Sequence, residues 1–302
     1  MKLKFLVTGG RGFIGSHFVE KVLNAGHYVT DIDKMTYCSH KTLPWDEHSR
    51  YELIEKDLND LEHLPPCDFL VNFAAESHVD NSITSPAIFS RSNYNGVQNI
   101  LELIRSKVYD RPFFVQISTD EVYGDIRDYL CKEEDTLYPS NPYSASKAAA
   151  EMLVLAYHKT YGIDYLITRS SNNYGPRQFE EKLVPKIIDS IKNERKIPIH
   201  GDGSYIRDWL YVKDNVDAIY HLILHAYKNE TFNISTKNHM TNLEVVKEIC
   251  RWYDIEDYEK HIELVPNRLG QDLRYYIDNE KLLSTGWEVG YPDKMYNFVT
   301  ND

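Results

Sequence analysis

The sequence predicts an α/β protein: a doubly wound parallel sheet with a smaller mixed α/β domain attached to it. Three observations lead to this prediction. The first half of the 302 residues alternates short β-branched runs with longer stretches of helical period, which is typical of a parallel sheet covered by helices on both faces. A glycine-rich turn directly follows the first of these runs. After about Ser170, prolines and glycines break the chain into shorter pieces, which indicates a second domain.

Six strands and two covering helices are expected in the first half of the chain. In the first helix, Ile14, Phe18 and Val22 recur at helical spacing, and Gly26 supplies the C-terminal stop. The second helix is expected to start at Ser85-Pro86, a natural cap and first-turn pair. Its later turns carry an apolar stripe formed by Val97, Ile100, Leu101 and Ile104. The strands are expected at Lys4–Thr8, Tyr28–Asp33, Tyr51–Glu55, Phe69–Phe73, Phe113–Ser118 and Tyr165–Arg169.

The expected domain boundaries lie where this pattern changes. The segment Arg207–Leu224 has the pattern of a strand followed by a helix, so the chain is expected to return to the first domain there. The first domain is therefore expected to comprise residues 1–170 and about 207–230. The second is expected to comprise about 171–206 and 231–302.

The composition excludes several classes of partner. The chain has 34 basic and 46 acidic residues, a net charge of -12, which argues against a nucleic-acid or anionic-membrane surface. Its four cysteines form no C-x-x-C pair, so disulfide and zinc-ribbon arrangements are not expected. The N-terminal apolar run is too short for a secretory signal, and no later window approaches a membrane span. A reducing, cytoplasmic location is therefore expected.

The glycine-rich turn predicts a dinucleotide site of the Rossmann type. Gly9, Gly12 and Gly15 form a G-x-x-G-x-x-G pattern between a strand and a helix, where the backbone can approach a pyrophosphate at the helix N-terminus. Asp33 ends the second strand, where an acid accepts hydrogen bonds from the adenosine ribose and repels a 2'-phosphate. NAD is therefore favoured over NADP. Asp31 is the alternative ribose acid, although the alternating strand pattern favours Asp33.

Other residues near this turn are expected to complete the cofactor site. The expected cofactor contacts beyond the glycines and Asp33 are Phe13, Ile14, Lys34, Asp57 and Leu58. Asp57-Leu58 follows the third strand and suits the adenine edge of the pocket. A simple turn at the end of the strand is an equally good interpretation.

A tyrosine and a lysine predict proton-transfer chemistry. Tyr143 and Lys147 are four residues apart, on one face of a helix that starts near Asn141-Pro142. Tyrosine is a poor base because its reference pKa is about 10, but a lysine cation and a positive nicotinamide ring favour the phenolate. Such a pair is common on protein surfaces, and the dinucleotide turn favours the catalytic interpretation. Asp120 and Glu121 follow the fifth strand, at the sheet edge where doubly wound folds bind ligands.

Several motifs together resemble the dTDP-glucose 4,6-dehydratases, which are extended short-chain dehydrogenases acting on nucleotide sugars. The resemblance covers nearly the whole chain, and its Thr-Asp-Glu signature is more specific than the general superfamily motif. The motifs are Gly9–Gly15, Ala74–Asp80, Ser118–Gly124, Tyr143–Lys147, Ser171–Pro176 and Arg207–Val212.

The resemblance implies a reaction cycle. Tyr143, assisted by Lys147 and Thr119, takes the O4 proton while the C4 hydride passes to NAD. Glu121 then removes the C5 proton, and Asp120 as general acid protonates the departing C6 hydroxyl. The hydride returns to C6, so NAD is regenerated in each turnover. The product is a 4-keto-6-deoxy sugar, and an additional inversion at C5 stays open.

The resemblance also implies further contacts and a partner. Ala74 is expected to contact NAD. A homodimer is expected, because the helix carrying Tyr143 and the one carrying Val97 form a four-helix interface in similar enzymes. For Arg268 a surface charge is the alternative interpretation. The histidines suggest no metal site. The expected contacts to the nucleotide sugar are Glu76, Asn81, Asn172, Lys182, Leu183, His200, Arg207 and Arg268.

The sequence departs from the family pattern near the expected substrate pocket. Asn81 stands where these dehydratases usually carry arginine, and His200 where they carry tyrosine. The shorter Asn81 is hypothesised to admit a bulkier 2-substituent, so UDP-N-acetylglucosamine, UDP-glucose and dTDP-glucose are the candidate substrates. A nucleotide-sugar 4-epimerase is the nearest alternative, but it needs no Asp120 and Glu121. A nucleotide-sensing regulator without chemistry is the alternative from another class.

Overall fold

A seven-stranded parallel sheet forms the centre of the molecule. The computed structural model describes residues 2–107, 109–126, 128–267 and 269–291. The strands lie in the order β10-β6-β5-β4-β1-β2-β3, and each pair is parallel. The six predicted strands are all confirmed, with ends that shift by at most one residue. The strands are β1 (Lys4–Thr8), β2 (Tyr28–Asp33), β3 (Tyr51–Glu55), β4 (Phe69–Asn72), β5 (Phe113–Thr119), β6 (Tyr165–Ser170) and β10 (Glu230–Ile234).

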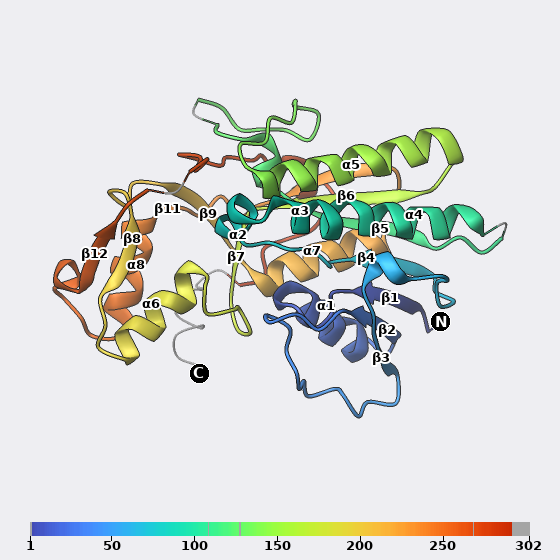
Figure 1. The fold of residues 1–302 in the computed structure, drawn as a ribbon, viewed down its shortest axis with the longest axis horizontal. Coiled ribbons are helices and arrows are strands. Elements are labelled where there is room, and N and C mark those ends of the chain that lie inside the picture. The colour runs from blue at the N-terminus through green and yellow to red at the C-terminus, as the bar shows by residue number, and fades with distance from the viewer. Residues whose placement is uncertain (1, 108, 127, 268, 292–302) are drawn as a thin grey trace.

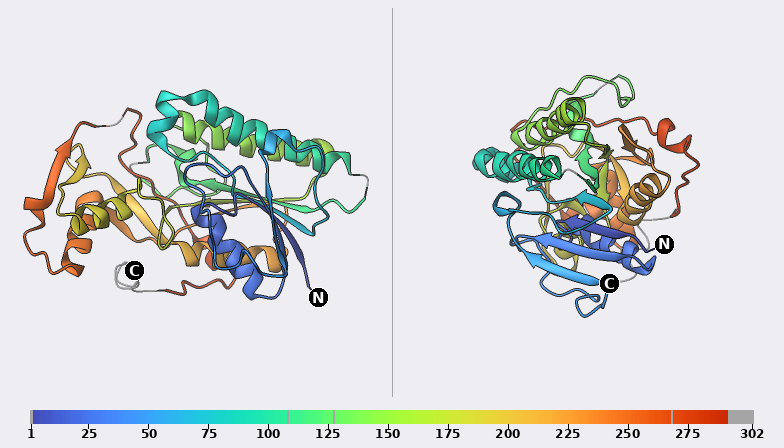
Figure 2. Two further views of the ribbon diagram at one scale, coloured as in Figure 1. Left: turned by 60° about the horizontal axis from the view of Figure 1, so that its bottom comes forward. Right: turned by 90° about the vertical axis from the view of Figure 1, so that its right-hand side faces the viewer.

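Helices cover both faces of this sheet, so the predicted doubly wound architecture is confirmed (Figures 1 and 2). One face carries α1 (Phe13–Asn24) and α7 (Val212–Leu224), and the other carries α4 (Gly96–Ser106) and α5 (Pro142–Tyr161). Each face encloses its own apolar core. The strand order reverses between β1 and β4, which places the ligand crevice at their carboxyl ends.

The segment before α4 is irregular in a way that the sequence did not indicate. After α2 (Val79–Thr84) the chain runs through α3 (Pro86–Phe89) and a π-helical turn (Ser90–Asn95) into α4. The helix does start at Pro86, but the Ser85 side chain makes no capping hydrogen bond. The expected side-chain cap is therefore wrong. Single π-turns often occur at functional sites, and this one faces the cofactor region described below.

A smaller lobe lies beyond the carboxyl ends of the central strands (Figure 1). It has its own apolar core around Tyr174, Ile187, Trp209 and Val246. Its two helices are α6 (Leu183–Lys192) and α8 (Asn242–Trp252). Its strands form two small sheets: β7 (Asn172–Tyr174), β9 (Ile206–Tyr211) and β11 (His239–Thr241), and β8 (Ile197–His200) with β12 (Ile262–Val265).

The chain crosses between the lobes more than once. The strand β10 belongs to the central sheet through Ile234. Leu282, in the short helix α9 (Glu280–Leu283), and Trp287 pack in the core beneath α1 and α7. We propose that these two segments belong to the first lobe. Each other described segment after Ile206 is assigned to the lobe against which it packs. Within the described residues, no helix is both long and apolar enough to cross a membrane.

Candidate active site

Two adjoining cavities open at the carboxyl ends of the central strands. The first cavity, of about 590 Å³, is lined by residues from the ends of β2, β3 and β4. The second is a cleft of about 2140 Å³ between the two lobes. Gly9, Gly12 and Cys38 line both. Because they share these residues, the two cavities meet at the glycine-rich turn.

The glycine turn lies between the two cavities and fits a pyrophosphate. Gly9 has φ of +73°, and a Cβ there would lie 2.6 Å from the Ala74 backbone nitrogen. The Gly12 amide donates to the Gly9 carbonyl at 3.1 Å, and α1 begins at Phe13 without a side-chain cap at Gly12. The first amides of α1 therefore face the cleft, as phosphate binding at a helix N-terminus requires.

The structure distinguishes the two acids of β2. Asp31 is fully buried and accepts hydrogen bonds from the Gly10 amide and the Tyr51 hydroxyl, both at 2.9 Å. Burial raises the pKa of Asp31 to about 7. Asp33 instead lines the first cavity, where it accepts from the amides of Arg11 and Met35. This geometry supports Asp33 as the residue that faces the ribose.

The remaining residues expected at the cofactor divide between the two cavities. Asp57 accepts hydrogen bonds from the amide and side chain of Asn59, so it both caps a turn and lines the first cavity. Phe13, Ile14 and Gly15 line the cleft. The first cavity also receives Lys34, Leu58 and Ala74.

The Tyr143–Lys147 pair lies in the cleft on the first two turns of α5. That helix begins with a capping box between Asn141 and Ser144, and with a proline in its first turn. Burial lowers the pKa of Lys147 to about 8, and its Nζ donates to the Ile117 carbonyl at 2.6 Å. Burial and the charge of Glu121 raise the pKa of Tyr143. These protein groups by themselves favour the neutral phenol, and the lysine-stabilised phenolate expected beside a nicotinamide ring stays a prediction.

Two adjacent acids meet the tyrosine at the end of β5. Asp120 is 2% exposed, and its Oδ2 has no hydrogen-bond partner among the described residues. Burial, then the charge of Glu121, raise the pKa of Asp120 well above its usual range. Burial also raises the pKa of Glu121, but Arg207 and Lys182 counteract that rise. Thr119 hydrogen-bonds Tyr143 and donates to Asp120 at 3.2 Å. The cleft thus brings the five predicted catalytic residues together.

The second lobe contributes most of the predicted substrate contacts. Arg207 is 8% exposed, and its Nη2 donates to the Asp272 carbonyl at 2.9 Å. The Lys182 Nζ donates to the Ser77 carbonyl at 3.1 Å, across the gap between the lobes. The predicted residues that line the cleft are Asn172, Lys182, Leu183, His200 and Arg207.

Two of the predicted substrate contacts in the described part of the chain do not line the cleft. Glu76 lies in the first cavity, where its carboxylate binds the Lys34 Nζ at 2.9 Å. Asn81 is exposed on α2 and donates to the Tyr37 hydroxyl at 3.4 Å. Neither residue lines the cleft, so their contact with a sugar stays a prediction. Arg268 lies outside the described residues.

The cleft also contains side chains that the sequence analysis did not assign to it. The hydroxyl of Tyr275 donates to Asp272 at 2.8 Å and lies 3.5 Å from the Glu121 carboxylate. The Asn141 amide lies 3.5 Å from the same carboxylate. The sequence could have indicated the position of Asn141, because it caps the helix that carries Tyr143. It could not have indicated that of Tyr275, because this residue lies in an irregular segment without periodicity.

The fold and the cleft define a dinucleotide-dependent enzyme of the short-chain dehydrogenase class that holds a second, bulky ligand beside the tyrosine. The family model described as GDP-mannose 4,6 dehydratase matches residues 6–292. The chain belongs to this family.

Several relatives are similar over nearly the full length. The low-salt glycan biosynthesis protein Agl12 of Haloferax volcanii is 42% identical, with 94% of this chain and 92% of the relative covered. A dTDP-glucose 4,6-dehydratase of Escherichia coli is 40% identical, with 99% and 94% covered. The structure of DesIV, a dTDP-glucose 4,6-dehydratase from Streptomyces venezuelae bound to NAD and dTDP, has a TM-score of 0.93 at 34% identity, with 98% and 96% covered.

The residues present fit NAD. A Cβ at Gly9 would lie 2.6 Å from the Ala74 backbone nitrogen, so this tight turn requires glycine, and Asp33 lines the first cavity, where its carboxylate would accept from a ribose. The glycine turn would hold the pyrophosphate, and Lys147 and Tyr143 would lie beside the nicotinamide. NAD is the cofactor of this enzyme.

Proposed function

We propose that the protein is a 4,6-dehydratase that converts a nucleotide-diphosphate hexose into the corresponding 4-keto-6-deoxy hexose with loss of water. One observation carries this function: two acids, the buried Asp120 and the half-buried Glu121, lie with Tyr143 in one cleft. An enzyme that only oxidises and reduces C4 needs the tyrosine but not the acids. The reaction is that of an NAD-dependent hydro-lyase.

The residues of the cleft divide the proton transfers between them. Tyr143 receives the O4 proton of the sugar, and its hydrogen bond to Thr119 stabilises the phenolate that this transfer requires. Lys147, fixed by the Ile117 carbonyl, provides the positive charge beside it. When bound, NAD supplies the two-electron oxidant for C4 and then the reductant for C6.

The elimination uses the two acids in opposite protonation states. Burial raises the pKa of Asp120 well above its usual range and so favours its protonated form, from which it donates a proton to the departing C6 hydroxyl. Glu121 lies within the field of Arg207 and Lys182, which favours its ionised form. It therefore removes the C5 proton, which the neighbouring 4-keto group has made acidic. The C5–H and C6–O bonds break, a C5=C6 double bond forms, and one water leaves.

We propose dTDP-glucose as the first substrate to test, followed by UDP-glucose and UDP-N-acetylglucosamine. Several relatives named as dTDP-glucose 4,6-dehydratases support this order. The hypothesis that Asn81 widens the sugar pocket loses its support, because Asn81 is exposed and does not line the cleft.

The test is incubation of the purified protein with these three sugars and no added cofactor. We expect mass spectrometry to detect a product lighter by one water, with no net consumption of NAD. A product of unchanged mass would contradict the proposal. The same reaction in D₂O, followed by NMR of the product, measures both deuterium incorporation and the configuration at C5.

A nucleotide-sugar 4-epimerase remains the second candidate because the fold is shared. The UDP-glucose 4-epimerase of Thermus thermophilus has a TM-score of 0.85 at 27% identity, with 98% of each chain covered. The pair of acids in the cleft, Asp120 and Glu121, favours the dehydratase. An epimer would have the same mass as its substrate, so the experiment above separates the two reactions.

We also propose a homodimer formed through α4 and α5, acting in the cytoplasm. These helices lie side by side on one face of the sheet (Figures 1 and 2). Met152 on α5 is 48% exposed, and Ile88 on the preceding α3 is 53% exposed, so apolar side chains remain available for a partner. The four cysteines are free, in keeping with a reducing compartment. Light scattering on the purified protein tests the dimer.

A further inference from the structure

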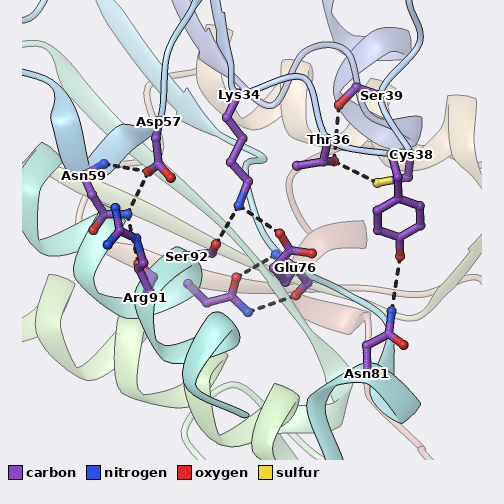
Figure 3. A network of polar contacts seen from close by, with 12 residues as sticks. Lys34, Thr36, Cys38, Ser39, Asp57, Asn59, Glu76, Asn81, Arg91 and Ser92 are labelled. Atoms are coloured by element: carbon purple, nitrogen blue, oxygen red, sulfur yellow. Dashed lines mark hydrogen bonds and ion pairs between the residues drawn. The ribbon is translucent and has the colours of Figure 1, made fainter. Parts of the chain in front are cut away.

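An ion pair crosses the first cavity beside the expected ribose position. The Lys34 Nζ lies 2.9 Å from the Glu76 Oε1 and donates to the Ser92 hydroxyl at 2.9 Å. The three residues come from the loops after β2 and β4 and from the π-helical turn before α4. Figure 3 shows the Lys34 side chain reaching across the cavity to both partners.

The position of Glu76 is itself fixed. Its backbone amide donates to the Asn93 Oδ1 at 2.8 Å, and the Asn93 Nδ2 donates back to the Glu76 carbonyl at 3.0 Å. Asn93 also donates to the Ser146 hydroxyl at 2.9 Å and is 2% exposed. The Glu76 side chain is 17% exposed, against 32% for that of Lys34. The carboxylate is therefore the more firmly held partner of the pair.

This arrangement bears on which dinucleotide the cavity accepts. Asp33 repels a 2'-phosphate, but Lys34 directly follows it and also lines the cavity. A lysine at the ribose end would attract the same phosphate. The Glu76 carboxylate compensates the Lys34 charge, occupies its donors and adds a second negative charge to the cavity wall. Negative charges on the cavity wall repel a negatively charged phosphate and so disfavour binding of the wrong dinucleotide.

We propose that the Glu76–Lys34 ion pair, together with Asp33, excludes the 2'-phosphate of NADP and so determines the preference for NAD. Glu76 thereby acts on the cofactor and not on the sugar. The inference depends on NAD as the cofactor but not on which sugar is the substrate.

The test measures which dinucleotide the protein holds, not its turnover. The purified protein and its variants are equilibrated with equal amounts of NAD and NADP and passed through a desalting column. The bound dinucleotides are then released with acid and quantified by mass spectrometry. Because Asp33 would mask part of the effect, the main comparison is between Asp33→Asn and Asp33→Asn with Glu76→Gln.

We expect the added Glu76→Gln change to raise the bound NADP:NAD ratio by about tenfold, equivalent to about 1.4 kcal/mol. Adding Lys34→Met to that variant should abolish the gain. This third variant is decisive because Lys56 also lines the cavity and could hold the phosphate instead. An unchanged ratio after Glu76→Gln, or a gain that survives Lys34→Met, would overturn the proposal.

Two controls keep the result interpretable. Asp57→Asn removes another carboxylate of the same cavity whose hydrogen bonds go to Asn59. An equal gain from that variant would mean that the overall negative field, and not the ion pair, excludes NADP, which would also overturn the proposal. If the Asp33→Asn background retains no dinucleotide, Glu76→Gln is compared with the unaltered protein, where the bound share of NADP must still rise. Thermal unfolding confirms that each variant is folded.

Discussion

Replacing Glu151 by glutamine should both destabilise the protein and change the pH dependence of its activity. Glu151 is fully buried on α5, one turn after Lys147. Its Oε2 accepts hydrogen bonds from the Nε and Nη2 of Arg169 at 3.0 and 2.7 Å, and its Oε1 accepts from the Ser118 hydroxyl. Arg169 is 4% exposed, and its Nη1 donates to the Tyr123 hydroxyl at 2.6 Å. The variant leaves this guanidinium buried without its counter-charge.

Breaking a buried ion pair by removing one partner costs about 3–5 kcal/mol. The glutamine oxygen can still accept from Arg169, so we expect a loss near the lower end, about 3 kcal/mol, in the free energy of unfolding measured with urea. The matched control is Glu248→Gln, which breaks an exposed pair with Arg251 at 2.9 Å. That variant should cost at most about 1 kcal/mol. Equal losses for the two variants would refute the reasoning.

The same variant should move the alkaline limb of activity. Burial lowers the pKa of Lys147 to about 8, whereas the charge of Glu151 raises it. Removing that charge lowers the pKa further, so Lys147 loses its proton at a lower pH. Because proton transfer at Tyr143 uses the lysine cation, we expect the fall of kcat/KM on the alkaline side to begin at lower pH. An alkaline limb that stays in place while stability falls would show that Glu151 has only a structural role.

Three further outcomes are expected. Asp120→Asn should slow water loss by about 10²–10⁴-fold and leave C4 oxidation intact. Reduced nicotinamide should therefore accumulate and be detected by its absorbance. Rapid product formation would remove Asp120 from the mechanism. Gly9→Ala should abolish NAD retention, because the new Cβ would lie 2.6 Å from the Ala74 nitrogen and a non-glycine residue held at positive φ destabilises the fold by about 1–3 kcal/mol. The dinucleotide released from the protein is quantified by mass spectrometry. Normal NAD occupancy would contradict this prediction. Tyr143→Phe should stop both the oxidation and the water loss while sugar binding persists by calorimetry, whereas residual oxidation would assign the O4 proton to another group.

The sequence was sufficient for six of the seven described strands of the central sheet, because their signals are local, whereas β10 was not predicted. The six strands and the glycine turn follow from periodicity and from steric demands that neighbouring residues make on each other. The Tyr143–Lys147 spacing likewise places both groups on one helical face. The same local reasoning failed at Ser85, whose side chain makes no capping hydrogen bond, and it gave no indication of the π-helical turn at Ser90–Asn95.

Side-chain direction in loops was harder to predict. Glu76 and Asn81 lie near residues that line the cleft, yet one turns into the first cavity and the other faces solvent. Their orientation depends on partners distant in sequence, Lys34 for the first and Tyr37 for the second. The buried Glu151–Arg169 pair is a similar case, because its partners lie on a helix and on the strand beneath it.

The two acids after β5 illustrate how one short segment supplies both an acid and a base. Asp120 and Glu121 are neighbours in sequence and carry the same acidic group, so local sequence gives no reason for their roles to differ. The difference comes from their surroundings. Arg207 lowers the pKa of both acids, so it does not distinguish them. Asp120 also lies near the negative charges of Glu121 and Asp208, whereas Glu121 also lies near the cation Lys182 and accepts a hydrogen bond from Asn141. Environments that separate the pKa values of two acids favour opposite roles for them. Because Lys182 belongs to the second lobe, we propose that the approach of that lobe favours Glu121 as the base, so that the division of roles is a property of the assembled cleft.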